Sequence, residues 1–252
     1  MAMENTDKTE IAWYHTFFDE DYLKYWSFVV TPEKTQKEIE FVLQTLALPE
    51  GSYILDLCCG QGRHALEFAR KGYQVTGLDI SETLLNHAKK SAEEQNLLVK
   101  FIHSDMREIP FTEEFDAIVN LFNAFGYLEN DDEDEKVVKA VAKALKNKGK
   151  FLIDLLSYKR LLMFEHKYTQ SSNLAVENSV DILSGRFKAR WLITDDNGEQ
   201  KERILVQRIY TFTEFNKMLK SSGLQVKKVF GGFDGSNYEI DSNRMIVLAE
   251  KI

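Results

Sequence analysis

The sequence predicts an α/β fold with a doubly wound, mostly parallel sheet of seven strands. Short apolar runs alternate with amphipathic stretches from Tyr53 to Leu155, and such alternation implies right-handed crossovers between parallel strands that helices cover on both faces. Glycine and helix-capping residues stand at the junctions between the runs. The 252 residues are 44% hydrophobic and 29% charged, which is ordinary for a globular protein with a sizeable core.

Residues 1–50 are predicted to be helical and to form a lid. The first half of this segment is rich in aromatic residues, namely Trp13, Tyr14, Phe17, Phe18, Tyr22, Tyr25 and Trp26. A second helix is expected to begin at Thr31 and Pro32, because threonine caps a helix and proline fits its first turn. Two interpretations of the aromatic rings stay open. Their faces could meet a cationic ligand, or they could pack on the core as one side of an amphipathic helix.

Residues 51–156 are predicted to form the core of the sheet. We expect strands over residues 53–57, 74–78, 98–103, 115–121 and 149–155, and helices over residues 63–71, 81–95 and 132–145. Gly72 can end the first of these helices in the left-handed conformation, and Ser81 can cap the second. The acidic run 129–135 enters the third helix, where carboxylates complement the helix dipole. We therefore interpret this run as a solvated face and expect no metal.

Residues 157–211 are predicted to form a small antiparallel β insertion. Its strands are expected over residues 174–183, 186–194 and 201–210, with turns at Ser184-Gly185 and over residues 195–198. The insertion could cap the substrate, or it could join two copies in a homodimer through an apolar face or an open edge. Residues 212–252 are expected to return to the main sheet. A helix over 213–222 and strands over 224–231 and 243–250 would place an antiparallel hairpin at its edge.

Charge and cysteine content exclude several classes of function. The formal net charge of −8 repels a phosphate backbone, and no long run of lysine or arginine offsets it, so we expect no nucleic-acid partner. No apolar run approaches the roughly 20 residues that cross a bilayer, and residues 1–32 are unlike a signal sequence. We therefore expect a cytoplasmic protein without membrane contact. Cys58 and Cys59 are the only cysteines, and adjacent cysteines form no disulfide framework or zinc site.

A glycine-rich turn follows the first predicted strand. Gly60 and Gly62 let a ligand approach main-chain N–H groups at the carboxyl edge of the sheet, because a Cβ atom would block that approach. The spacing Gly60-x-Gly62-x-x-Ala65 also satisfies the relaxed fingerprint of dinucleotide-binding dehydrogenases. Asp79 ends the next strand, 19 positions after Gly60, where a carboxylate can accept hydrogen bonds from both hydroxyls of a ribose. Together these elements predict a ligand that contains adenosine.

Two carboxylates favour S-adenosylmethionine (SAM) over a dinucleotide. Asp56 precedes the turn, and its charge would repel a pyrophosphate but suits the ammonium and sulfonium groups of SAM. Asp105 offers an acceptor for the adenine amino group, and Met106 offers an apolar contact for the adenine ring. A nicotinamide-dependent oxidoreductase and a non-catalytic SAM-binding protein remain as alternatives.

The string Asp56-Leu57-Cys58-Cys59-Gly60-Gln61-Gly62 resembles the D-x-[GC]-x-G-x-G motif of class I SAM-dependent methyltransferases, with Cys58 at a place that glycine usually holds. The resemblance implies a Rossmann-like fold, SAM as cofactor and S-adenosylhomocysteine as product. Asp79 is similar to the ribose-binding acid of this superfamily, and residues 120–127 are similar to the segment that borders methionine and substrate. The expected cofactor-binding residues are Asp56, Cys58, Gly60, Gly62, Asp79, Ile80, Asp105, Met106, Asn120, Leu121, Tyr14 and Arg63.

The resemblance also implies methyl transfer to a small molecule. The segment Phe125-Gly126-Tyr127, the aromatic N-terminus and the β insertion are similar to those of enzymes that N-methylate amino sugars or other small amines. Transfer from a sulfonium is an in-line displacement of an already activated group, so no catalytic side chain is required. Candidate bases for deprotonating an amine are Tyr127, Asp154, Glu165 and His166. Substrate choice is expected to depend on the N-terminal aromatic segment and on residues 174–210.

Overall fold

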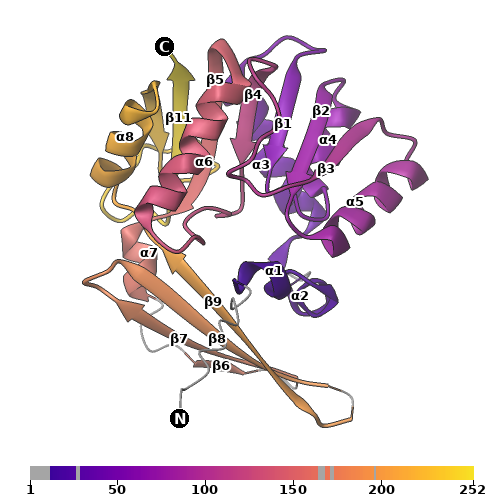
Figure 1. The fold of residues 1–252 in the computed structure, drawn as a ribbon, viewed down its shortest axis with the longest axis vertical. Coiled ribbons are helices and arrows are strands. Elements are labelled where there is room, and N and C mark those ends of the chain that lie inside the picture. Colours follow the sequence, from indigo (N-terminus) through magenta and orange to yellow (C-terminus); the bar gives the residue numbers. More distant parts are fainter. Residues whose placement is uncertain (1–11, 27–28, 164–167, 171–172, 196) are drawn as a thin grey trace, which may run out of the picture.

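The computed structural model describes residues 12–26, 29–163, 168–170, 173–195 and 197–252. Its main sheet has seven strands in the order β10-β11-β5-β4-β1-β2-β3 (Figure 1). These strands are β1 (Tyr53–Leu57), β2 (Gln74–Asp79), β3 (Val99–His103), β4 (Phe115–Asn120), β5 (Leu145–Leu156), β10 (Leu224–Phe230) and β11 (Arg244–Lys251). Strand β11 runs antiparallel to β5 and to β10, and the remaining neighbours are parallel. The predicted fold class and the C-terminal antiparallel hairpin are confirmed.

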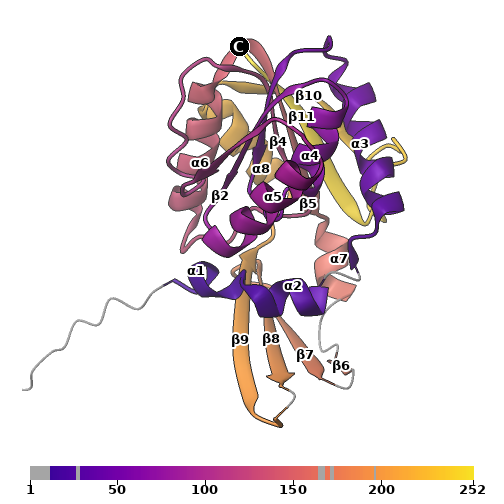
Figure 2. The same cartoon turned by 90° about the vertical axis from the view of Figure 1, so that its right-hand side faces the viewer.

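Helices cover both faces of this sheet, with α6 and α3 on opposite sides in Figure 2. The covering helices are α3 (Pro32–Leu46), α4 (Arg63–Arg70), α5 (Glu82–Glu94), α6 (Asp131–Ala144) and α8 (Phe212–Ser221). Successive strand residues point to opposite faces, and Ile54 and Leu55 of β1 follow this rule. Ile54 packs in a cluster with Ile39 of α3 and Phe68 of α4. Leu55 packs in a second cluster, with Val137 of α6.

The predicted capping residues end or begin the helices as expected. Thr31 precedes α3, and its side-chain oxygen accepts a hydrogen bond from the Lys34 N–H at 3.2 Å. Ser81 does the same for α5, where it accepts from the Leu84 N–H at 3.1 Å. Gly72 follows α4 with a φ of +87°, a left-handed conformation that costs glycine little. The local sequence pattern therefore predicted these helix boundaries to within a residue or two.

The interpretation of the acidic run as a solvated face is wrong for Asp134. This side chain is fully buried and accepts a hydrogen bond of 2.7 Å from the Tyr210 hydroxyl. Burial raises the pKa of Asp134 to about 6, although the bond from Tyr210 opposes the rise. The run therefore contains an anchor that joins α6 to the end of the β insertion, because a buried carboxylate requires a partner. Only the tertiary position of Tyr210 reveals it.

The β insertion is a separate sheet of four strands below the main one (Figure 1). After the short helix α7 (Tyr158–Met163), it consists of β6 (Tyr168–Gln170), β7 (Leu174–Asp181), β8 (Arg186–Thr194) and β9 (Gln200–Arg208), paired antiparallel in that order. The prediction of three strands missed β6, because three residues are too few to show an alternating pattern. The last predicted strand also extended too far, since β9 ends at Arg208.

Two N-terminal helices lie between the two sheets (Figure 2). They are α1 (Tyr14–Phe17) and α2 (Glu20–Trp26). Phe17 is buried and its ring meets Trp191 of β8 edge to face, with centroids 5.0 Å apart. These rings form a third apolar cluster together with Phe187 and Ile193 of β8. Part of the aromatic segment thus packs as core. None of the helices in the described ranges is both long and apolar enough to cross a membrane.

Candidate functional site

The glycine-rich turn between β1 and α4 has three residues in the left-handed region. Cys58, Gly60 and Gly62 have φ angles of +60°, +54° and +81°. At Gly62 an added Cβ would lie 2.9 Å from the Cβ of Ala88 in α5, so the turn can approach that helix only with glycine. Cys58 adopts a conformation that costs a non-glycine residue about 1 kcal/mol or more. Strain of this kind is typical of ligand-binding turns.

Asp79 at the end of β2 is tied to this turn. Its Oδ2 accepts from the Gly60 N–H and its Oδ1 from the Ser81 N–H, each at 2.8 Å. The side chain is largely buried, which raises its pKa, while these two N–H bonds oppose the rise. Each carboxylate oxygen can accept a further bond, and Asp79 lines the large cavity described next. It can therefore meet a ribose as predicted while it also shapes the turn.

A cavity of about 840 Å³ extends from the turn to the β insertion. At one end its wall contains Cys58, Gly60, Asp79, Ile80, Met106 and Leu121. At the other end it contains apolar residues of the small sheet, among them Val176, Phe187, Ala189, Trp191 and Leu205. Tyr14, Phe18 and Tyr22 of the N-terminal segment also face it. Pockets for small molecules have volumes of roughly 300 to 1,000 Å³, so this cavity has room for a cofactor and a small second molecule.

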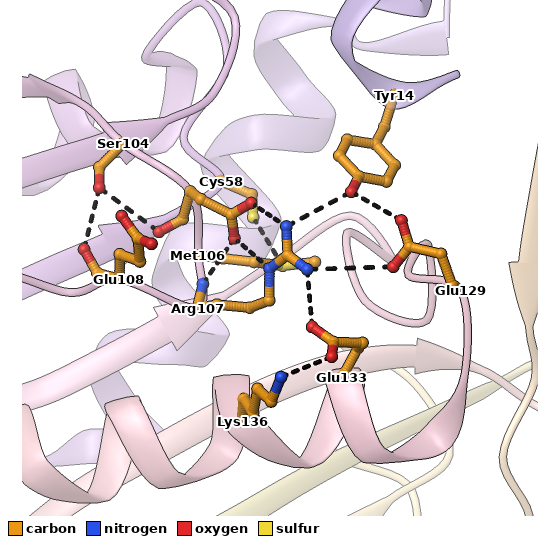
Figure 3. A network of polar contacts seen from close by, with 10 residues as sticks. Tyr14, Cys58, Ser104, Met106, Arg107, Glu108, Glu129, Glu133 and Lys136 are labelled. Carbon is orange, nitrogen blue, oxygen red and sulfur yellow. Dashed lines mark hydrogen bonds and ion pairs between the residues drawn. The ribbon is translucent and has the colours of Figure 1, made fainter. Parts of the chain in front are cut away.

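Asp105 after β3 is held by Arg107. Arg107 belongs to a network of polar contacts that reaches Tyr14 (Figure 3). The Oδ1 of Asp105 accepts from the Arg107 N–H at 2.8 Å and from Nε at 3.0 Å, and its Oδ2 accepts from Nη2 at 2.7 Å. Arg107 also pairs with Glu133 of α6 at 2.7 Å, and the Tyr14 hydroxyl donates to Glu129 at 3.2 Å. An adenine amino group would therefore have to share Asp105 with Arg107. Beside it, the sulfur of Met106 lies 3.6 Å from that of Cys58.

Arg63 at the start of α4 lies in the cavity wall, and its side chain is only 14% exposed. Its Nη1 donates to Glu38 Oε2 at 2.5 Å and to the Thr35 hydroxyl at 3.0 Å. His64 shares Glu38, with 2.9 Å between Nε2 and Oε2. Burial lowers the pKa of His64 to about 4. Burial alone would raise the pKa of Glu38, but the bond from His64 and the charge of Arg63 lower it to about 2.

Asp56 and Asn120 lie beneath the turn, outside the cavity wall. Asp56 is 1% exposed, and burial raises its pKa to about 7 against the opposing charge of Arg63. Its Oδ2 has no hydrogen-bond partner among the described residues. The Asn120 amide donates to the Leu57 carbonyl at 3.0 Å and to the Ala124 carbonyl at 3.4 Å. Asn120 thus ties the end of β4 to the end of β1, and neither side chain is part of the described cavity wall.

The candidate bases differ in position. Tyr127 lines the cavity, where burial raises the pKa of its hydroxyl. Asp154 of β5 is fully buried outside the cavity wall and pairs with Arg244, whose Nε donates to Oδ1 at 2.6 Å. Its Oδ2 accepts from the Phe122 N–H at 3.0 Å. We do not retain Asp154 as a base, because Arg244 and Phe122 occupy its carboxylate. Glu165 and His166 lie outside the described residues.

The segment after β4 is held by a residue that the sequence did not reveal. Phe122 and Asn123 have φ angles of +64° and +63°, which are unusual for residues other than glycine. Gln207 of β9 donates to the carbonyls of Asn123 and Phe125 at 3.0 and 2.7 Å, and its Oε1 accepts from the Asn123 amide at 2.8 Å. The Oδ1 of Asn123 in turn accepts from the Leu156 N–H at 2.9 Å. These bonds join the insertion to the cavity floor.

Glu38 and Lys34 of α3 were also missed, although one signal was present. Both stand on the helix face that carries Val42, four positions after Glu38, and a carboxylate within an apolar stripe usually has a buried partner.

Among the described residues, no group of three or more histidine, cysteine, aspartate or glutamate side chains is arranged to hold a metal.

Comparisons with known proteins identify the relatives of this chain. A family profile described as a methyltransferase domain matches residues 54–149. The Bacillus subtilis (strain 168) protein YqeM, assigned to the methyltransferases, is 30% identical over 81% of this chain and 86% of its own length. A glycine/sarcosine N-methyltransferase of Aphanothece halophytica is 23% identical over 94% of this chain and 91% of its own.

Solved structures share the fold. The CcbJ methyltransferase of Streptomyces caelestis superposes with a TM-score of 0.81 at 18% identity, over 94% of this chain and 98% of its own. SAM-bound CalS10 of Micromonospora echinaspora, an amino pentose methyltransferase, gives a TM-score of 0.68 at 19% identity, over 92% and 97% of the two chains. The methyltransferase profile and the similarity to YqeM set aside the nicotinamide-dependent and non-catalytic alternatives.

Proposed function

The chain belongs to the class I SAM-dependent methyltransferases, and on that premise we propose that it methylates a small molecule at an amine nitrogen. The observation that carries this proposal is the continuous cavity between the glycine-rich turn and the β6–β9 sheet. A cavity of this size admits a cofactor with a small acceptor. It would not admit a folded macromolecule.

SAM, when bound, supplies a methyl group that is already activated by the adjacent sulfonium. The acceptor lone pair forms the new N–C bond as the C–S bond breaks, and the electron pair stays on sulfur, which yields S-adenosylhomocysteine. The methylated nitrogen then loses its proton to water. The protein has to align the two reactants and to keep water away from them. The rings of Phe18, Tyr22 and Trp191 in the cavity wall suit that task.

The protonation states in the cavity favour an acceptor that needs no strong base. Every carboxylate and imidazole in the described cavity wall already has a hydrogen-bond partner: Glu38, His64, Asp79 and Asp105. Tyr127 is a poor base because burial opposes its ionisation. A neutral amine carries a lone pair without deprotonation by the protein, whereas an alcohol does not become nucleophilic so easily. The N-methyltransferases among the relatives support the same acceptor class.

A matched panel of acceptors tests this proposal. Purified protein with SAM is offered amines, the alcohols with the same carbon skeleton and the corresponding phenols, and release of S-adenosylhomocysteine is measured. We expect turnover with amines alone, and retention of that turnover in EDTA. Transfer only to oxygen, or only to a protein or nucleic acid in a cell extract, would contradict the proposal and leave the family assignment intact.

A further inference from the structure

We propose that the acceptor carries an anionic group, such as a carboxylate, and that this group binds at Lys34 of α3 and Arg244 of β11. The inference rests on the proposed function and names the substrate class more closely. The acceptor would be an apolar or aromatic amine with an acidic group. The evidence is the distribution of charge around one end of the cavity.

Three cationic side chains of the cavity wall lie close enough to act on one another: Lys34, Arg63 and Arg244. The carboxylates that pair with them in the described structure are Glu38, bonded to Arg63, and Asp154, bonded to Arg244. This group of five side chains therefore has one positive charge in excess. Cations that are brought together out of water repel one another. A bound anion would relieve that repulsion.

Lys34 forms no ion pair with a carboxylate of the described residues. Its ammonium group donates to the Val29 carbonyl at 3.1 Å and lies 4.9 Å from the centre of the Phe122 ring. Half burial lowers its pKa, and the charges of Arg63 and Arg244 add to this change, whereas those of Glu38 and Asp154 oppose it. A carbonyl and a ring face compensate a desolvated ammonium less well than a carboxylate does.

Arg244 offers the second contact. Its Nε and Nη2 donate to Asp154, which fixes the plane of the guanidinium. Because a guanidinium has five N–H donors, others remain for a bound anion. Neighbouring Asn243 also lines the cavity and adds an amide. A guanidinium held in this way is preorganised for a planar anion.

The apolar wall beside these residues argues for the acceptor as the source of the anion. Arg63 directly follows the glycine-rich turn and belongs to the cofactor end. Lys34 of α3 shares the Phe122 ring with Arg63, each 4.9 Å from its centre, so the cations extend from the cofactor end to Arg244 of β11. The apolar wall of β7, β8 and β9, with Phe187 and Trp191, is part of the same cavity. An apolar body with an acidic group fits both surfaces.

The first experiment distinguishes the two sources of a carboxylate. Binding of S-adenosylhomocysteine and of methylthioadenosine, which lacks the amino-acid part, is measured by calorimetry for the wild type and for Lys34→Met. We expect both affinities to stay within twofold of the wild type. If Lys34→Met weakens S-adenosylhomocysteine alone, the cluster holds the cofactor carboxylate and the inference is wrong.

The second experiment uses two fluorescent probes on the protein saturated with S-adenosylhomocysteine. Anilinonaphthalene sulfonate is an apolar anion, and N-phenylnaphthylamine has the same rings without the charge. We expect Lys34→Met to weaken the sulfonate about tenfold, as for the loss of one charge-assisted contact, and to leave the uncharged probe unchanged. Lys34→Arg should restore the sulfonate to within about threefold. The matched control is Lys37→Met, an exposed lysine of the same helix.

Turnover provides a readout that separates this inference from the proposed function. With phenethylamine and phenylalanine, which differ by a carboxylate, Lys34→Met should raise KM for the second acceptor alone and leave kcat unchanged. Equal weakening of both probes, or no preference of the wild type for the anionic member of either pair, would overturn the anion site. Turnover with uncharged amines would still support amine methylation in that case.

Discussion

The two ends of the cavity are built in different ways. At the cofactor end, the Asp79 carboxylate accepts hydrogen bonds from the N–H groups of Gly60 and Ser81, within a short stretch of chain. At the acceptor end, Phe17 meets Trp191, and Gln207 holds the segment at Asn123, so residues far apart in the sequence form one wall. We therefore expect recognition of the cofactor to depend on local backbone geometry, and recognition of the acceptor to depend on how separate segments pack.

Removal of the insertion should give the largest effect. Replacing residues 174–205 by a short Gly-Ser linker keeps Gln207 and its bonds to the cavity floor but deletes most of the apolar wall. We expect methyl transfer to be abolished and S-adenosylhomocysteine to bind within a few-fold of the wild type, as measured by calorimetry. A truncated protein that keeps its kinetics but changes from dimer to monomer would instead identify the insertion as an assembly element.

Asp79→Ala should damage only the cofactor end. Two charge-assisted hydrogen bonds to a ribose would disappear, so we expect the affinity for S-adenosylhomocysteine to fall by about 2 to 4 kcal/mol. Calorimetric titration measures the loss, and thermal unfolding shows whether the turn survives. An unchanged affinity in a folded variant would remove Asp79 from the site.

Asp56 should make the stability of the cofactor end depend on pH. Burial raises its folded pKa from 3.8 to about 7, so the folded state holds this proton more tightly than the unfolded state. The stability that protonated Asp56 adds to the folded state is fully present below about pH 4. It is lost as pH rises through about 7, and it amounts to up to a few kcal/mol of unfolding free energy. Urea unfolding of the ligand-free protein at several pH values measures it. Asp56→Asn should weaken the dependence of the unfolding free energy on pH in this window. An unaltered dependence would assign the effect to other groups.

Gln207→Ala tests the junction between the two ends and should give the smallest of these effects. It leaves two carbonyls and the Asn123 amide without their partner, which costs about 1 to 3 kcal/mol of unfolding free energy. We expect kcat/KM for an amine acceptor to fall and the affinity for S-adenosylhomocysteine to stay the same. The surface variant Gln200→Ala, at the far end of the same strand, is the control. Equal losses in both variants would argue against a positioning role.

Sequence reasoning succeeded where the signal is local. The turn at Gly62, the end of β2 at Asp79 and the caps Thr31 and Ser81 were all predicted from patterns of a few positions. It failed for Asp134, whose partner Tyr210 is 76 residues away, and for Gln207, whose partner Asn123 is 84 residues away. A single polar residue in a strand has no periodic signature. Its burial depends on the docking of the whole insertion.

The sequence by itself determined the strand–helix alternation, the glycine-rich turn and the acid at the end of β2, and hence the fold and the cofactor. It could do so because backbone conformation and hydrophobic periodicity are properties of neighbouring residues. Only the tertiary structure decided that Lys34, Arg63 and Arg244 face one cavity, and that rings of α1 and β8 cover it. Such a wall forms from long-range packing, in which each side chain is placed by segments that are distant in the chain.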